Sequence, residues 1–99
     1  MSTVSAVIVT TTIEWEGRTI RLSYYPRRWD VIDHIELESE NRTPLPVTET
    51  GYKSHFFAPV TPPYTADELI SHTRNWLDEA ARDPDWLAAE ERRRQLSLF

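Results

Sequence analysis

The sequence contains no cysteine, which excludes disulfide bonds, thiolate-bound zinc and a cysteine nucleophile. It has only two glycines, Gly17 and Gly51, so a glycine-rich phosphate-binding loop is also excluded. Acidic residues outnumber basic ones, 16 to 11, and the net charge of −5 leaves no chain-wide basic surface for a polyanion. We therefore expect no strong direct nucleic-acid binding, and any contact with DNA to be local or through a partner.

Long hydrophobic runs are missing as well. The apolar run from Ala6 to Val9 is too short to cross a bilayer. The segment Met1–Val4 lacks the basic residues that begin a signal peptide. These features, together with the lack of cysteine, predict a cytoplasmic protein that makes no membrane contact. A chain of 99 residues is long enough for one domain with a single core.

Four stretches have the composition of β-strands: residues 4–15, 18–25, 31–39 and 52–57. The first two alternate apolar and polar side chains on either side of Glu16-Gly17, which is a turn signal, so they predict a hairpin. Pro26 is expected to end the second strand. In the third stretch, Asp33 interrupts an apolar face formed by Val31, Ile35 and Leu37, so we expect that strand to begin near His34.

Helical signals follow the strands. Thr65 and Glu68 have the spacing of a capping box, which predicts a helix that begins there. Apolar and small residues recur at helical spacing and should cover the sheet: Leu69, Thr73, Trp76, Leu77 and Ala80. Pro84 ends this helix near Asp83 and can occupy the first position of a second, short helix.

The order of these elements predicts an α+β fold, because the strands come first and the helices follow. We expect an antiparallel meander of about four strands, then one long and one short C-terminal helix, and a flexible tail. Residues 1–87 would form a single domain. Residues 88–99 would form a polar arm that ends in an apolar peptide.

The apolar peptide consists of Gln95, Leu96, Ser97, Leu98 and Phe99, and it follows a charged segment. Exposed apolar clusters of this kind usually mark a binding site for a partner. The pentapeptide resembles the motif Gln-Leu-[Ser/Asp]-Leu-Phe, with which bacterial proteins bind the DNA polymerase III sliding clamp. All five positions match, and the resemblance covers only these five residues.

The resemblance implies a partner and a mode of binding. Motifs of this family dock in an extended conformation into a hydrophobic pocket on each clamp protomer, with the glutamine at the rim and the final Leu-Phe pair deep inside. It predicts a non-enzymatic adaptor or regulator of bacterial, phage or plasmid DNA replication or repair. The alternative is a small structural or self-associating domain, in which the apolar tail packs on its own sheet or on a neighbouring subunit of a homo-oligomer.

Two groups of arginines are candidates for a secondary contact. Arg27 and Arg28 precede Trp29, and such a cluster can stack a base or bind phosphate. The alternative is that Trp29 closes one end of the core while both arginines remain solvated.

The second group is the triplet Arg92, Arg93 and Arg94, which could touch DNA threaded through the clamp. It could equally form ion pairs with Glu90 and Glu91 at helical spacing, and this interpretation is favoured.

Catalysis and metal binding find little support in the sequence. His34, His55 and His72 are the only histidines, and no two of them have the local spacing of metal ligands. We expect no catalytic residues, no metal and no cofactor, although a small hydrolase or nuclease is an alternative. The aromatic residues could form a base-stacking face, but the strand pattern favours a core role for them: Trp15, Tyr24, Tyr25, Tyr52, Phe56, Phe57, Trp76 and Trp86.

Overall fold

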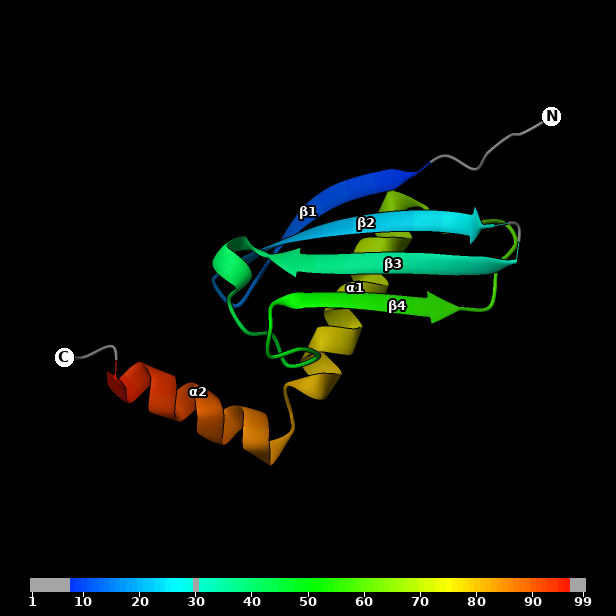
Figure 1. Cartoon of the computed structure of the whole chain (residues 1–99). Coiled ribbons are helices and arrows are strands. Elements are labelled where there is room, and N and C mark those ends of the chain that lie inside the picture. Colours follow the sequence, from blue (N-terminus) through cyan, green and yellow to red (C-terminus); the bar gives the residue numbers. More distant parts are fainter. Residues whose placement is uncertain (1–7, 30, 97–99) are drawn as a thin grey trace.

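The computed structural model describes residues 8–29 and 31–96, and residues 1–7, 30 and 97–99 lie outside the described part (Figure 1). Four strands form one antiparallel sheet in the order β1-β2-β3-β4: β1 Val9–Trp15, β2 Arg18–Arg28, β3 Ile32–Ser39 and β4 Tyr52–Phe57. A 3-10 turn, η1 (Glu40–Arg42), follows β3. The two helices are α1 (Ala66–Ala80) and α2 (Pro84–Leu96). The predicted α+β meander with two C-terminal helices is confirmed.

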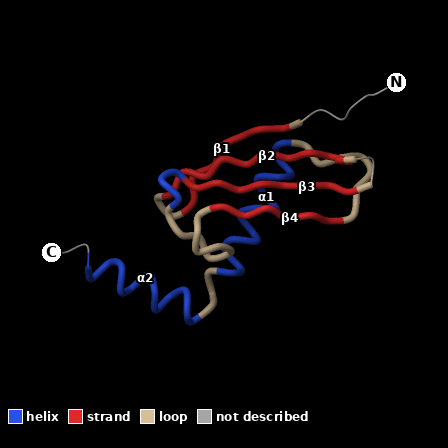
Figure 2. The backbone as a smooth tube through the Cα atoms, viewed as in Figure 1, coloured by secondary structure: helices blue, strands red, loops and turns tan. Residues whose placement is uncertain are grey.

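The sheet and α1 form two layers (Figure 2). Helix α1 crosses one face of the sheet, and the side chains between the two layers form the core. Its buried members come from β1, β2, β3, the loop before β4, and α1: Ile13, Trp15, Ile20, Leu22, Tyr24, Ile35, Leu37, Leu45, Leu69 and Leu77. No helix in the described part of the chain covers the opposite face. We call that side the open face of the sheet.

The first hairpin follows the prediction, with one change at each end. Glu16 and Gly17 make the turn with φ of 46° and 77°, the pair of positive values that matches the twist of a tight hairpin. Strand β1 begins at Val9 rather than Val4, and the first residues of the predicted strand lie outside the described range.

Strand β2 does not end at Pro26, as expected, but continues to Arg28. The pairing with β3 shifts register between Tyr25 and Arg28, which marks a bulge. A bulge tolerates proline because the residue there does not have to donate a ladder hydrogen bond.

Strand β3 begins at Ile32, so the expectation that Asp33 precedes the strand is wrong. Asp33 is fully buried on the α1 side of the sheet, where its carboxylate accepts a 2.7 Å hydrogen bond from the hydroxyl of Tyr24. The backbone amides of Arg27 and Val60 donate to the same carboxylate, at 2.8 and 3.3 Å. These bonds compensate for its burial. Burial and this neighbouring carboxylate raise the pKa of Tyr24.

Helix α1 begins as predicted. Thr65 accepts from the Glu68 amide and Glu68 accepts from the Thr65 amide, which completes the capping box. Leu69, Thr73 and Leu77 are buried against the sheet.

Helix α2 begins at Pro84 behind Asp83, whose carboxylate accepts from the Asp85 amide at 2.9 Å. It was expected to be short, but it extends over 13 residues and includes the polar segment before the pentapeptide. Neither α1 nor α2 has the length and apolar composition needed to cross a bilayer, and no other described helix has them either.

Candidate functional site

Helix α2 is attached to the domain near its beginning. The ring of Trp86 lies 6.4 Å from the ring of Trp15, whose side chain belongs to the core. The guanidinium of Arg18 lies over both indoles, 5.7 Å from Trp15 and 5.3 Å from Trp86. Such a cation between two aromatic faces favours one orientation of the helix.

An ion pair extends this attachment along α2. Arg18 Nη2 donates to Glu90 Oε1 at 2.7 Å, and both side chains are largely buried. Burial opposes ionisation of Glu90, but hydrogen bonds from Arg18 and Arg93 outweigh it and lower the pKa of that carboxyl. The guanidinium of Arg93 also lies 5.1 Å from the ring of Trp86. Glu90 is therefore ionised at neutral pH and holds the middle of α2 against β2.

The end of α2 carries the first residues of the pentapeptide. Gln95 and Leu96 form its last turn, and both are exposed, with 71% of Leu96 accessible to solvent. Ser97, Leu98 and Phe99 lie outside the described residues. Leu96 is therefore not packed on the sheet.

The arginine triplet forms the ion pairs that helical spacing predicts. Arg93 pairs with Glu90, and Arg94 pairs with Glu91. Arg92 is exposed on the same helix. These pairs support the structural interpretation of the triplet.

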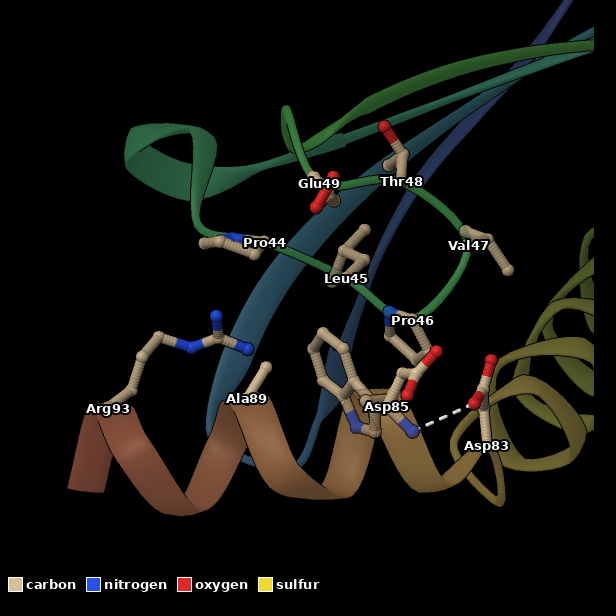
Figure 3. Close-up of a pocket in the computed structure, with 11 residues that line it drawn as sticks. Pro44, Leu45, Pro46, Val47, Thr48, Glu49, Asp83, Asp85, Ala89 and Arg93 are labelled. Atoms are coloured by element: carbon tan, nitrogen blue, oxygen red, sulfur yellow. Dashed lines mark hydrogen bonds between the residues drawn. The ribbon is translucent and has the colours of Figure 1, made fainter. Parts of the chain in front are cut away.

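A groove of about 620 Å³ lies between the loop after η1 and helix α2 (Figure 3). The loop provides Pro44, Leu45 and Pro46, and α2 faces them with Trp86 and Ala89. Its charged residues are Glu49, Asp83, Asp85 and Arg93. Asp83 already caps α2, and the described residues that line the groove include no histidine, serine or cysteine.

A second cluster lies on the open face, at the end of the sheet where β2 passes into β3. Tyr25, His34 and Phe56 are neighbours on three adjacent strands. Their rings stack, with centroids 5.3 Å apart between Tyr25 and His34 and 4.2 Å apart between His34 and Phe56. Trp29 adds a fourth ring, 6.3 Å from Phe56 and tilted by 18°. We call these four rings the aromatic stack.

The outer part of the stack is accessible to solvent. Trp29 is 67% exposed and Phe56 is 45% exposed, whereas His34 is buried beneath them. The idea that Trp29 closes the core is therefore wrong, as is the core role predicted for Tyr25 and Phe56. Val31, predicted on the apolar face of β3, precedes that strand and is 70% exposed.

One arginine flanks the aromatic stack, and the arginine before it in the sequence bonds to a neighbouring loop. The guanidinium of Arg28 lies 4.6 Å from the centroid of Tyr25 and 4.9 Å from that of Trp29. Arg27 donates from its guanidinium to the hydroxyl of Thr61. The structure thus brings Arg28 and Trp29 of the predicted group into contact, whereas the Arg27 side chain bonds to Thr61.

His34 is held at the centre of the stack. Its Nε2 lies 2.5 Å from Ser54 Oγ and 3.8 Å from a carboxylate oxygen of Glu36, while its Nδ1 is buried without a hydrogen-bond partner among the described residues. Burial lowers the pKa of His34; the Glu36 carboxylate opposes this shift and the Arg28 guanidinium adds to it. The ring is therefore neutral at pH 7.

The other two histidines lie on the α1 side of the sheet. His55 and His72 line an apolar groove of about 230 Å³ between β4 and α1. The ring of His55 lies 5.2 Å from that of Trp76, and the ring of His72 lies 4.8 Å from that of Tyr64. Within the described ranges, no three histidine, aspartate or glutamate side chains form a group that could hold a metal ion.

A comparison with protein families matches residues 8–86 to the KlcB third domain. The chain belongs to the KlcB third-domain family. The match includes the whole sheet, α1 and Trp86, whereas most of α2 and the pentapeptide lie outside the matched range. No curated protein and no solved structure gave a significant match.

Sequence reasoning missed several residues that shape the aromatic stack in this family member. Tyr25, His34 and Phe56 were assigned to strands but not to one cluster, because their proximity depends on the register of three strands. The period-2 alternation of a strand puts His34 on the face opposite Ile35 and Leu37. Alignment of the strands by their apolar faces could have placed all three rings side by side.

Proposed function

We propose that the chain is a non-enzymatic, cytoplasmic adaptor of bacterial, phage or plasmid DNA replication or repair. It binds the sliding clamp through Gln95, Leu96, Ser97, Leu98 and Phe99. The observation that carries the proposal is the five-residue match to the clamp-binding motif, which begins in the exposed last turn of α2. Trp86 and Glu90 hold the helix, and the pentapeptide begins beyond these contacts.

The side chains of the motif are sufficient for reversible binding. Burial of Leu96, Leu98 and Phe99 would supply about 1.5–3 kcal/mol each. The ordering of the peptide and the loss of free motion offset much of this gain. We therefore expect a dissociation constant on the order of micromolar, which suits a partner that exchanges on the clamp.

Docking requires a local change at the end of α2. The motif docks in an extended conformation, whereas Gln95 and Leu96 are in the last turn of the helix. The final carbonyl groups of a helix have no intrahelical partners, so its terminal turn opens more easily than its middle. The peptide would leave the helix on binding while Trp86 and Glu90 keep the earlier turns in place.

The test compares two exposed leucines on the same helix. Leu96→Ala should weaken binding to a purified clamp roughly tenfold, since it removes about 1.5 kcal/mol of apolar burial. Leu87→Ala is the matched control: Leu87 is also on α2 and is 56% exposed, but it lies outside the motif. It should leave binding unchanged. A chain that ends at Arg94 should not bind.

Other results would contradict the proposal. The pentapeptide would not be the binding site if the intact chain failed to bind the clamp, or bound as well without residues 95–99. If Leu98→Ala and Phe99→Ala lowered the melting temperature, or removal of the pentapeptide lowered the mass measured by light scattering, these residues would serve the core or a homo-oligomer instead.

A further inference from the structure

The aromatic stack differs from the core aromatics because its outer end is open. Tyr25, His34 and Phe56 present nearly parallel rings, with interplanar angles of 22° and 8°, and Trp29 continues the series as its most exposed member. A further planar ring could extend such a stack. Offset stacking between π systems is favourable beyond the burial of their area.

Arg28 beside the stack, and Arg27 before it in the sequence, differ from most other arginines in the chain. Six arginines form ion pairs with glutamates: Arg18, Arg21, Arg42, Arg82, Arg93 and Arg94. Arg27 and Arg28 have no carboxylate within 4.0 Å among the residues that the structure describes. In a chain with an excess of acidic residues, their positive charge therefore remains available to an anion beside Trp29.

The backbone holds this arrangement in an uncommon conformation. Arg27 and Trp29 have φ of 50° and 56°, in the left-handed region that side chains other than glycine disfavour. The buried carboxylate of Asp33 accepts from the Arg27 amide and fixes the bulge. Strained residues that the surrounding structure supports are often found at binding sites.

We propose that the aromatic stack binds an unpaired nucleotide of single-stranded nucleic acid, with the base on Trp29 and the phosphate near Arg27 and Arg28. The exposed ring of Trp29 can stack with a planar base, and Arg27 and Arg28, which have no carboxylate partner among the described residues, can bind a phosphate. An acidic protein segment would satisfy the arginines, but it would leave the exposed end of the stack without a ring.

The charge of the chain limits the strength of this contact. The site offers two cations, and on the same face Arg21 is already paired with Glu38. If the two arginines neutralise two phosphates of a single strand, a plot of log K for binding against log salt concentration should have a slope of about −1.4. Binding should therefore be weak, local and specific for unpaired bases, and it should not depend on the pentapeptide.

The experiment uses the full chain without the clamp. At about 50 mM salt, an oligothymidylate of about ten nucleotides should quench the fluorescence of Trp29, because the base stacks on its ring. Trp29→Ala should weaken binding, measured by anisotropy of a labelled oligonucleotide, by about fivefold or more. Trp29→Phe should retain most of the binding but lose the quenching.

A charge-matched control separates stacking from general attraction. Arg28→Ala should weaken binding and reduce the salt slope. Arg74→Ala, which removes an exposed arginine of α1, should do neither. The proposal is wrong if Trp29→Ala binds as tightly as the unchanged chain or if Arg74→Ala is as harmful as Arg28→Ala. It is also wrong if a duplex of equal length or an oligoglutamate quenches Trp29 as strongly as the single strand.

Discussion

Replacement of Trp86 by alanine tests whether one side chain holds α2 in place. No residue of α2 is fully buried, so the helix depends on few contacts. A tryptophan side chain offers about 150–250 Å² of surface. If about 150 Å² of Trp86 is removed from water, its burial is worth up to about 4 kcal/mol at about 25 cal/mol per Å².

Loss of this contact should unfold α2 without unfolding the domain. An isolated helix of 13 residues is marginal in water, even with favourable ion pairs between its side chains. The buried core between α1 and the sheet contains no residue of α2. Because α1 has 15 residues and α2 has 13, Trp86→Ala should remove nearly half of the helical signal at 222 nm in circular dichroism.

Leu87→Ala is the control, because it truncates an exposed neighbour on the same helix and should leave the helical signal unchanged. Thermal unfolding of the Trp86→Ala variant should still be cooperative, since α1 and the sheet remain packed. If Trp86→Ala keeps the full helical signal, then the Arg18–Glu90 pair and the helix's own ion pairs suffice. The indole of Trp86 would then not be what anchors α2.

Two further predictions concern the stability of the domain. Gly51→Ala should lower the free energy of unfolding by about 3 kcal/mol or more, because φ of Gly51 is +77° and a Cβ there would lie 2.5 Å from the carbonyl carbon of Arg42. Gly17→Ala, at the same φ but with open space around it, should cost only about 1 kcal/mol by denaturant unfolding. If both substitutions lowered the free energy of unfolding equally, the close approach of Arg42 to Gly51 would not be what makes Gly51→Ala more harmful. For His34, whose folded-state pKa is lowered, the unfolded chain binds more protons near pH 6. The free energy of unfolding should therefore decrease as the pH falls below about 6.5, and His34→Gln should reduce this dependence; an unchanged pH profile in that variant would contradict it.

The sequence predicted the elements of this fold because each has a local signal. Alternating strands, the Glu16-Gly17 turn and the Thr65–Glu68 capping box are all confirmed. The errors arose where tertiary contacts override local rules. Pro26 is accommodated within β2 by a bulge, and Asp33 is accepted inside β3 because three donors converge on its carboxylate.

The candidate sites differ in how far sequence can predict them. The pentapeptide is contiguous, so five adjacent letters identify it, and the clamp remains a prediction. The aromatic stack combines residues from three strands and a turn, and its existence depends on strand register and on the left-handed conformation of Trp29. Neither property has a local signal in the sequence, although Arg27, Arg28 and Trp29 did indicate where a contact could lie.

The positions of the two proposed sites suit an adaptor. The aromatic stack lies at the end of the sheet where β2 passes into β3, and the end of α2 lies at the opposite end of the molecule (Figure 1). A clamp bound to the pentapeptide would therefore leave the stack accessible. Tethering by a short linker gives an effective concentration on the order of millimolar. A contact with a dissociation constant of about 0.1 mM would then be mostly occupied near the clamp and mostly empty in free solution. Because the aromatic stack binds weakly, its contact with nucleic acid would be confined to DNA that already carries a clamp.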